Sequence, residues 1–365
     1  MKYLFRSLLL FSTLSFCSLV WAGLKGFQPA VLIESSKPEY PVNVRSDSGG
    51  NLSRDSGVVE LIYMVDKSGI PSQIMIVNSS HTKFNQAAND AISEYRYNTA
   101  TLNSKPVESV VSTLVRFEFS ALDLRDSRGV RSQSVAEDGY RNMPNGFSTF
   151  YKRITTELKK TNPIERKVLH TISKMEAIKH QTFFSLAYLS IARLNYARKL
   201  GSEYQQINAI NDLIRFDEFI SEQYKILTGE TKTTYLAALV KLQIESGMFA
   251  EALKSYTDFK QRDPQIEKMF DATIVKLEDL RKSQSIVERT IKIGEQGFVH
   301  LPLLKRVFLL DQIQGNVDQL NLRCDTRFLK ILYKPDSQYD IPTNWGNCNL
   351  QIIGTAGTKA TLIQQ

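Results

Sequence analysis

The spacing of apolar residues changes twice along the 365-residue chain, and this change constrains the fold most strongly. In residues 37–120 apolar and polar residues alternate as in strands, apart from one short helical stretch. In residues 147–293 apolar residues recur every three or four positions, as in amphipathic helices. In residues 294–365 the alternation returns. These changes predict an α+β protein of several domains, with a helical domain between two regions that contain sheets.

The first 22 residues have the pattern of a secretory signal peptide. Lys2 and Arg6 precede an apolar run over residues 8–20, and Ala22 is small, as the residue before a cleavage site should be. A retained membrane anchor is the alternative, but the run is shorter than the ~20 residues of a spanning helix. We expect export to the periplasm of a Gram-negative bacterium, with cleavage after Ala22.

Export places the cysteines in an oxidising compartment. Removal of residues 1–22 also removes Cys17, so Cys324 and Cys348 remain as a pair. We predict a disulfide between them, which would contribute about 3 kcal/mol by the chain-entropy relation. Two cysteines without a nearby histidine are too few for a zinc site.

Charge and motifs exclude several functions. The net charge is +8, but lysines and arginines are interspersed with acids, so no nucleic-acid-binding stripe is predicted. A mildly cationic surface would suit a protein that works near anionic lipid. The four histidines form no i, i+4 pair, and no nucleophile-elbow, phosphate-loop or zinc-protease motif occurs. We therefore predict no enzyme, no catalytic residue, no cofactor and no metal.

Residues 37–120 are predicted to form a three-stranded antiparallel sheet with one helix. A hairpin over residues 58–80 turns at Asp66-Lys67-Ser68-Gly69, and residues 84–95 form the helix on one face of the sheet. The final strand, residues 107–119, alternates cleanly and contains no proline. Its residues predicted to face solvent are Glu108, Ser112, Arg116 and Glu118.

Residues 121–146 lack periodicity and are predicted to be a linker. Within residues 147–293, helical hairpins are predicted around Gly201 and Gly247. The second hairpin resembles a tetratricopeptide repeat, through Leu239, Gly247, Phe249, Ala252, Tyr256 and Pro264. Val240, Gln243 and Phe259 depart from that pattern. The resemblance implies an α-solenoid-like domain, and an ordinary helical bundle is the alternative.

Residues 294–365 contain short alternating stretches separated by turn residues such as Gly315-Asn316 and Pro335-Asp336. Short strands at this spacing predict a small all-β sandwich or barrel. A core of this size is marginal, and the predicted disulfide would compensate for it.

Four segments in residues 38–120 together resemble the C-terminal domain of TonB-type energy transducers. In chain order they are KPEYPVNVR, GVVELIYMVDKSGIPSQIMIVNSS, KFNQAANDAISEYRYNTA and NSKPVESVVSTLVRFEFS. Thr99 stands where the family usually has proline. The resemblance implies a domain that binds an extended peptide of an outer-membrane transporter by adding it to the sheet as a strand.

The resemblance also implies where a partner binds. The residues expected at this site come from the KPEYPVNVR segment and from the final strand. They are Tyr40, Pro41, Val111, Thr113, Val115 and Phe117. A long, regular strand without proline suits this purpose if it lies at the edge of the sheet. A central or covered position for the strand is the alternative.

Other features depart from an energy transducer. About 15 residues between the leader and the domain, at ~3.5 Å each, cannot span the periplasm. Two further domains follow the TonB-like one. We therefore predict a periplasmic accessory of TonB-dependent transport that binds a transporter segment or another TonB-system component. The alternatives are an envelope scaffold, or a membrane-anchored energy transducer if residues 1–22 are retained.

Overall fold

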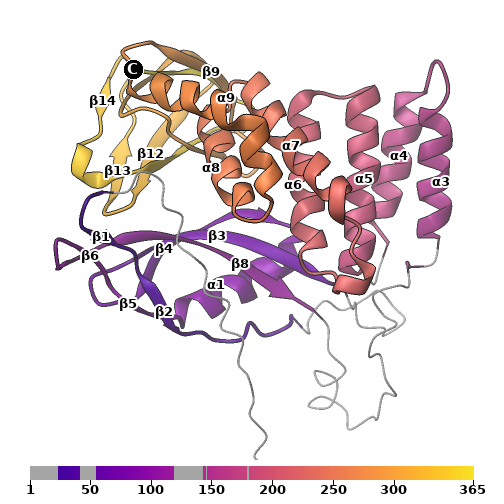
Figure 1. The fold of residues 1–365 in the computed structure, drawn as a ribbon, viewed down its shortest axis with the longest axis horizontal. Helices are drawn as coiled ribbons and strands as arrows, with labels where there is room; N and C mark the ends of the chain where they lie inside the picture. The colour runs from indigo at the N-terminus through magenta and orange to yellow at the C-terminus, as the bar shows by residue number, and fades with distance from the viewer. Residues whose placement is uncertain (1–23, 42–54, 119–142, 145, 179–180) are drawn as a thin grey trace, which may run out of the picture.

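The computed structural model describes residues 24–41, 55–118, 143–144, 146–178 and 181–365 (Figure 1). It has the predicted α+β composition, with several small antiparallel sheets and a set of helices. The predicted leader and most of the predicted linker lie outside the described residues.

The N-terminal region contains the predicted three-stranded antiparallel sheet. Its strands are β3 (Gly57–Val65), β4 (Pro71–Ser79) and β8 (Ser109–Phe117), in the order β4-β3-β8. The short 3-10 helix η1 (Thr82–Phe84) leads into α1 (Asn85–Ser93), which packs on one face of the sheet. Their shared core is made by Val59, Leu61, Tyr63, Val65, Phe84, Ala88, Ile92, Val115 and Phe117.

Short strands before residue 37 extend this region. β1 (Phe27–Gln28) pairs with β6 (Ala100–Leu102), which also pairs with β7 (Lys105–Val107). β2 (Val31–Glu34) pairs with β5 (Arg96–Asn98). β1 and β2 are not predicted from the sequence, because strands this short carry too little alternation to be recognised.

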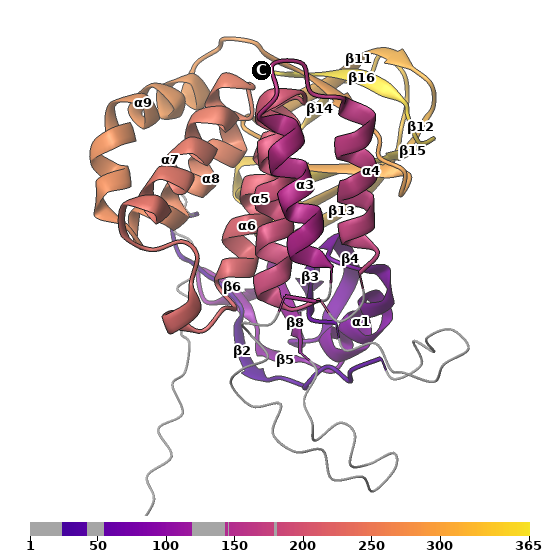
Figure 2. The same cartoon turned by 90° about the vertical axis from the view of Figure 1, so that its right-hand side faces the viewer.

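Residues 147–282 form helices that lie side by side (Figure 2). Their bounds are α3 Phe147–Leu158, α4 Glu165–Glu176, α5 Phe183–Lys199, α6 Glu203–Asp217, α7 Gly229–Glu245, α8 Phe249–Lys260 and α9 Pro264–Lys282, with a 3-10 helix η3 at Glu222–Tyr224. The breaks predicted near Gly201 and Gly247 separate α5 from α6 and α7 from α8. The tetratricopeptide-like interpretation stays a prediction.

Three helix starts follow from local chemistry. Thr182 and Ser202 each form a capping box with the residue three positions later, at the starts of α5 and α6. Asp263 accepts a hydrogen bond from the Gln265 amide, and Pro264 occupies the first turn of α9.

The C-terminal region is a pair of four-stranded antiparallel sheets around one core. One sheet contains β10 (Phe298–Pro302), β15 (Cys348–Gly354), β12 (Val317–Cys324) and β13 (Phe328–Leu332), in that order. The other contains β14 (Tyr339–Asp340), β11 (Val307–Gln314), β16 (Lys359–Gln364) and β9 (Val287–Lys292). A 3-10 helix, η4 (Thr343–Trp345), precedes β15. Strand pairing therefore begins at β9, before residue 294, where the sequence predicts the β region to start.

The predicted disulfide between Cys324 and Cys348 is present. The two residues face each other across β12 and β15 and lie in the sandwich core. The bond therefore joins two neighbouring strands at the end of one sheet.

The central strand β3 is buried on both faces. Val58, Ile62 and Met64 point away from α1, yet each is at most 5% exposed. Val58, with Leu114 of β8, packs against α5 and α6, and β12 of the sandwich lies against β8. Figure 1 shows the sheet between α1 and the helices and sandwich.

This arrangement corrects the prediction that the second face of the sheet is solvated. Ser112 and Arg116 are exposed, but Glu108 is half-buried. The Arg116 guanidinium lies 5.2 Å from the ring centres of Phe183 and Phe219. The alternation along the final strand does not reveal this, because the covering side chains come from distant segments.

The β3–β4 turn depends on one glycine. Asp66 Oδ1 accepts hydrogen bonds from the amides of Ser68 (2.8 Å) and Ile70 (2.9 Å). Gly69 has φ +80°, and its carbonyl accepts a hydrogen bond from the Tyr97 amide at 3.0 Å. A Cβ atom at Gly69 would lie 2.1 Å from the Tyr97 carbonyl oxygen.

We predict that Gly69→Ala destabilises the protein more than Gly357→Ala does. Both glycines have positive φ, but a Cβ at Gly357 meets no atom within 4 Å. Gly357→Ala should cost about 1–2 kcal/mol for its backbone conformation, and Gly69→Ala about 1–3 kcal/mol more for the clash. Denaturant unfolding of both variants measures the difference, and equal losses would contradict the described turn.

Candidate partner-binding edge

Strand β8 is a regular edge of its sheet. Its nine residues pair with β3 without a register shift, from Gly57 opposite Phe117 to Val65 opposite Ser109. Among the described residues, no strand pairs with the other edge of β8. The outward main-chain groups of β8 are therefore suitable for hydrogen bonding to an added strand.

The opposite edge, β4, is less regular. Its pairing with β3 shifts register between Glu60 and Leu61 and again between Ile62 and Met64. Gln73, within β4, has φ +50°. Such irregularities interrupt the ladder and hinder pairing of another strand. The two edges therefore differ, and β8 is the better template.

Four of the residues predicted to bind a partner lie on β8 and turn their side chains toward the core. Val115 and Phe117 are buried, and the Phe117 ring stacks on Phe84 at 4.6 Å between centres. Thr113 Oγ1 is 2.7 Å from Tyr63 Oη, which also shares a hydrogen bond with Tyr97 Oη. Val111 is half-buried against the same core. Their contribution to an added strand would come from the main chain.

The other two predicted residues precede the sheet. The Tyr40 ring meets Phe84 edge-on at 5.9 Å, and its hydroxyl donates to the Asp55 carbonyl at 2.8 Å. Pro41 is half-buried. The structure thus brings Tyr40 and Phe117 together on Phe84, from the two ends of the domain. A binding role for all six residues stays a prediction.

The comparison with protein families identifies this region. Residues 37–120 match the model of the Gram-negative bacterial TonB protein C-terminal family. The match confirms the resemblance and covers less than half of the chain. Domains of this family belong to the Gram-negative envelope and interact with other proteins without being enzymes. A comparison with curated proteins finds no match.

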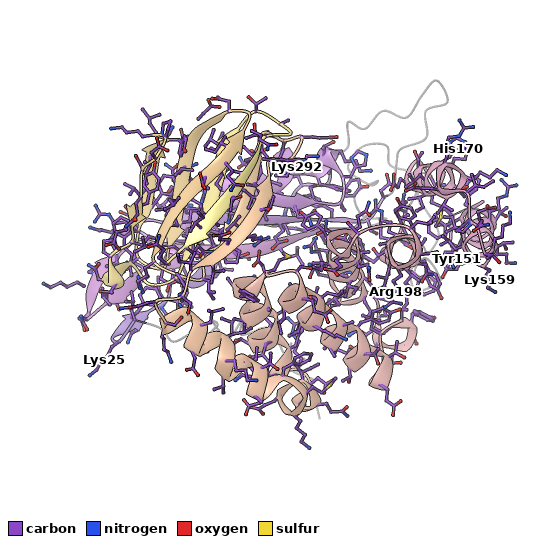
Figure 3. All side chains as sticks on the ribbon, turned by 90° about the horizontal axis from the view of Figure 1, so that it is seen from above. Lys25, Tyr151, Lys159, His170, Arg198 and Lys292 are labelled. Carbon is purple, nitrogen blue, oxygen red and sulfur yellow. A yellow bond between two sulfur atoms is a disulfide. The ribbon has the colours of Figure 1, made fainter. Side chains whose placement is uncertain are left out.

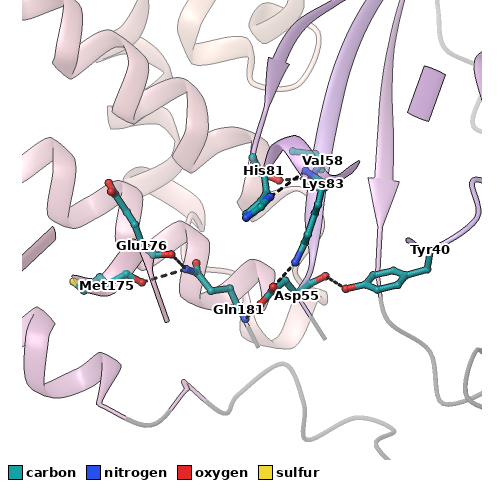
Figure 4. Close-up of polar contacts among 9 residues, drawn as sticks. Tyr40, Asp55, Val58, His81, Lys83, Met175, Glu176 and Gln181 are labelled. Carbon is teal, nitrogen blue, oxygen red and sulfur yellow. Dashed lines mark hydrogen bonds and ion pairs between the residues drawn. The ribbon is translucent and has the colours of Figure 1, made fainter. Parts of the chain in front are cut away.

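One junction between the TonB-like domain and the helices centres on Gln181 (Figure 4). The Gln181 amide donates to Asp55 Oδ1 at 2.8 Å, and its carbonyl accepts from the Ser56 amide at 2.6 Å. Gln181 Nε2 donates to the Met175 carbonyl (3.1 Å) and the Glu176 carbonyl (3.0 Å) at the end of α4. Asp55 Oδ2 pairs with Lys83 Nζ. No local sequence pattern predicts these contacts, because Gln181 and Asp55 are 126 positions apart.

A second junction joins the TonB-like domain to the sandwich. Arg323 is 4% exposed and donates to Gln351 Oε1 at 2.9 Å and to the Gln73 carbonyl of β4 at 3.2 Å. Burial lowers the pKa of Arg323 to about 10. Burial, aided by the nearby charges of Arg323 and Lys254, lowers the pKa of His300 to about 3. The His300 ring is thus neutral at pH 7.

An ion pair links the same sheet to α6. Arg215 Nη2 lies 2.7 Å from Glu60 Oε2 on β3, and Arg215 Nη1 lies 3.3 Å from Asp212 Oδ1. Burial raises the pKa of Asp212 despite the neighbouring charges of Arg215 and Arg193. Glu60, a polar residue on the buried face of β3, therefore links the sheet to α6.

Among the described residues, ionisable side chains are spread over many elements. Figure 3 labels Lys25 before β1, Lys159 directly after α3, His170 on α4, Arg198 on α5 and Lys292 on β9. In the part of the chain that the structure describes, no three His, Cys, Asp or Glu side chains are grouped to hold a metal ion. None of the described helices is both long and apolar enough to cross a membrane.

We predict that His300 makes the protein acid-sensitive. A pKa of about 3 in the folded protein, against 6.5 for an ordinary histidine, means that unfolded chains bind the proton more readily. The neutral ring therefore stabilises the fold above about pH 6.5, and this contribution falls as pH drops from 6.5 toward 3. His300→Gln, which cannot titrate, should flatten the decline.

Unfolding free energies measured between about pH 7.5 and about pH 4 test this prediction. The matched control is His170→Gln on α4, where the side chain is exposed. The control should keep the wild-type decline. An unchanged decline in His300→Gln would contradict the assigned role.

Proposed function

We propose that the TonB C-terminal-like domain binds an extended segment of a protein partner by strand addition to β8. The observation that carries this proposal is the nine-residue, unshifted pairing of β8 with β3 and the absence of a further paired strand among the described residues. Main-chain hydrogen bonds would supply affinity, and alternate side chains of the added strand would supply selectivity.

Two features of β8 bear on selectivity. Ser112 and Arg116 are the exposed side chains on the strand, and Arg116 forms an ion pair with Glu118 at 2.5 Å. An acidic side chain beside Arg116 would be favoured over a basic one. Such rim charges affect the choice of partner and the association rate more than the affinity.

The family match supports a proposal for the biological setting. We propose a periplasmic accessory of TonB-dependent outer-membrane transport, which binds a transporter segment or another component of the TonB system. The helices α3 to α9 would hold a second partner if they form the tetratricopeptide-like array that the sequence predicts. Two bound partners would make the protein an adaptor.

A purely structural role is the second candidate. It is favoured by the burial of Val58, Ile62 and Met64 on the face away from α1, where Val58 packs against α5 and α6. In that role the protein is an envelope scaffold, and the TonB-like sheet only docks against its neighbours. A membrane-anchored energy transducer is a variant of the first role and requires retention of residues 1–22. An intact Met1 in the membrane fraction would support retention.

Cysteine cross-linking tests strand addition directly. We predict that a Ser112→Cys variant forms disulfides with a transporter-derived peptide only when the peptide cysteine stands at alternate positions. The reason is that side chains of an added strand alternate between the two faces of the sheet, and facing residues lie about 4.5–5.5 Å apart.

Asn78→Cys on β4 provides the matched control, since Asn78 is exposed on the opposite edge strand. This variant should give little cross-linking. Equal yields at successive peptide positions, or stronger yields from Asn78→Cys, would refute addition at β8 and favour the scaffold role.

A further inference from the structure

Positive charge is concentrated at one end of the helical region. Residues 147–178, which include α3 and α4, contain seven lysines or arginines and three glutamates, a net charge of +4. Residues 183–282, which include α5 to α9, contain 14 basic and 14 acidic residues and are neutral. The hairpin formed by α3 and α4 therefore carries a net charge equal to half of the +8 of the whole chain.

All seven basic side chains of the α3–α4 hairpin are exposed. They are Lys152 and Arg153 on α3, Lys159 and Lys160 in the connection, and Arg166, Lys167 and Lys174 on α4. Figure 1 shows α3 and α4 at the opposite end of the molecule from the sandwich, and Figure 3 labels Lys159 at this end. Positive charge is thus presented to solvent over both helices and their connection.

The acids of the hairpin do not neutralise this surface. Glu157 pairs with Lys160 at 2.6 Å. The other two acids bind side chains of α5, Glu165 to Tyr196 and Glu176 to Arg193. In the part of the chain that the structure describes, the remaining six basic side chains of the hairpin form no ion pair with its three acids.

Helix stability does not explain the whole charge. Cations are favourable near the C-terminal end of a helix, where the helix dipole is negative, and unfavourable near the N-terminal end. Lys159 and Lys160 follow the end of α3, and Lys174 lies in the last turn of α4, so these three fit. Arg166 and Lys167 lie in the first turn of α4, where they oppose the dipole. Their presence there points to a role outside the fold of the hairpin.

Exposed aliphatic side chains accompany the cations. Ile164 directly precedes α4, is 47% exposed, and stands between Lys160 and Arg166 in the chain. Leu169, within α4, is 42% exposed. Aliphatic side chains next to lysines and arginines are typical of segments that lie on lipid, because the cations meet anionic headgroups while the apolar groups reach the acyl boundary.

We infer that the α3–α4 hairpin docks on an anionic lipid surface. Positive charge and exposed aliphatic side chains both match such a surface, whereas nucleic acid offers phosphates but no apolar layer for Ile164. The cations extend over two helices and their connection, which suits a broad anionic surface better than a short acidic peptide. Water solvates these exposed cations in the free protein, so the fold itself does not need the lipid.

Docking through this hairpin goes beyond strand addition to β8 and does not depend on it. The C-terminal end of α4 reaches the TonB-like domain, because Gln181 bonds both the Glu176 carbonyl and Asp55. The connection between α3 and α4 lies at the other end of α4, away from the sheet. Lipid bound at the connection therefore leaves β8 accessible to a partner.

Vesicle flotation of the full exported chain tests this inference. The probes are vesicles that contain phosphatidylglycerol, vesicles of phosphatidylcholine alone, and polyglutamate as an acidic polymer. The test variant carries Lys159→Gln, Arg166→Gln and Lys167→Gln. The control variant carries three substitutions at exposed lysines of α8 and α9, Lys254→Gln, Lys268→Gln and Lys276→Gln. Both variants lower the net charge equally.

We expect the wild-type chain to float with the anionic vesicles and not with the neutral ones, and to be released by salt. The test variant should bind the anionic vesicles at least about tenfold more weakly, and the control should bind them as the wild type does. Absence of wild-type binding, equal weakening in both variants, or binding to polyglutamate without binding to vesicles would overturn the inference. Circular dichroism of each variant confirms that it is folded.

Ile164→Ser tests the apolar part of the same contact. Serine is a favourable residue before a helix, so α4 should keep its start. This variant should bind the anionic vesicles several-fold more weakly, because less apolar surface reaches the lipid. Val275→Ser on α9, where the side chain is 54% exposed, is the matched control and should bind normally. Unchanged binding of Ile164→Ser would contradict docking through the connection.

Discussion

The burial of β3 on both faces is the constraint on which the rest of the structure depends. In a three-stranded sheet with one helix, a single face is normally covered and the other meets water. Here Val59, Leu61 and Tyr63 pack toward α1, while Val58 and Met64 are buried on the other face, where Val58 packs against α5 and α6. The TonB-like domain is therefore built into the molecule, and only an edge of its sheet is left to accept a strand.

The covering of the second face depends on polar contacts as much as on apolar ones. Glu60, Asp55 and Gln73 on the domain meet Arg215, Gln181 and Arg323 from the helices and the sandwich. Removal of one partner would take a hydrogen bond or ion pair from a group that is largely screened from water, and such a loss is costly. These contacts thus fix the position of the domain relative to the other two regions.

Local chemistry was predictable from the sequence, and assembly was not. The Asp66–Gly69 turn, the breaks at Gly201 and Gly247 and the Cys324–Cys348 bond each rest on a few residues with strong preferences. The regular alternation of β8 was also visible. Gln181 and Arg323 carried no such signal, because an isolated glutamine or arginine does not indicate which distant backbone it will meet. Alternation along β8 predicts the direction of the Thr113 and Phe117 side chains. It does not predict that both are enclosed in the core, which leaves only the main chain of β8 for binding.

Hydrogen exchange of the full chain, with and without a transporter-derived peptide, tests the central claim most directly. A strand added to β8 covers only the amides that point outward, which alternate along the strand. The account predicts slower exchange at alternate amides of Ser109–Phe117 and no change in β4 (Pro71–Ser79). Protection of β4 instead, or of the helices without β8, would contradict it.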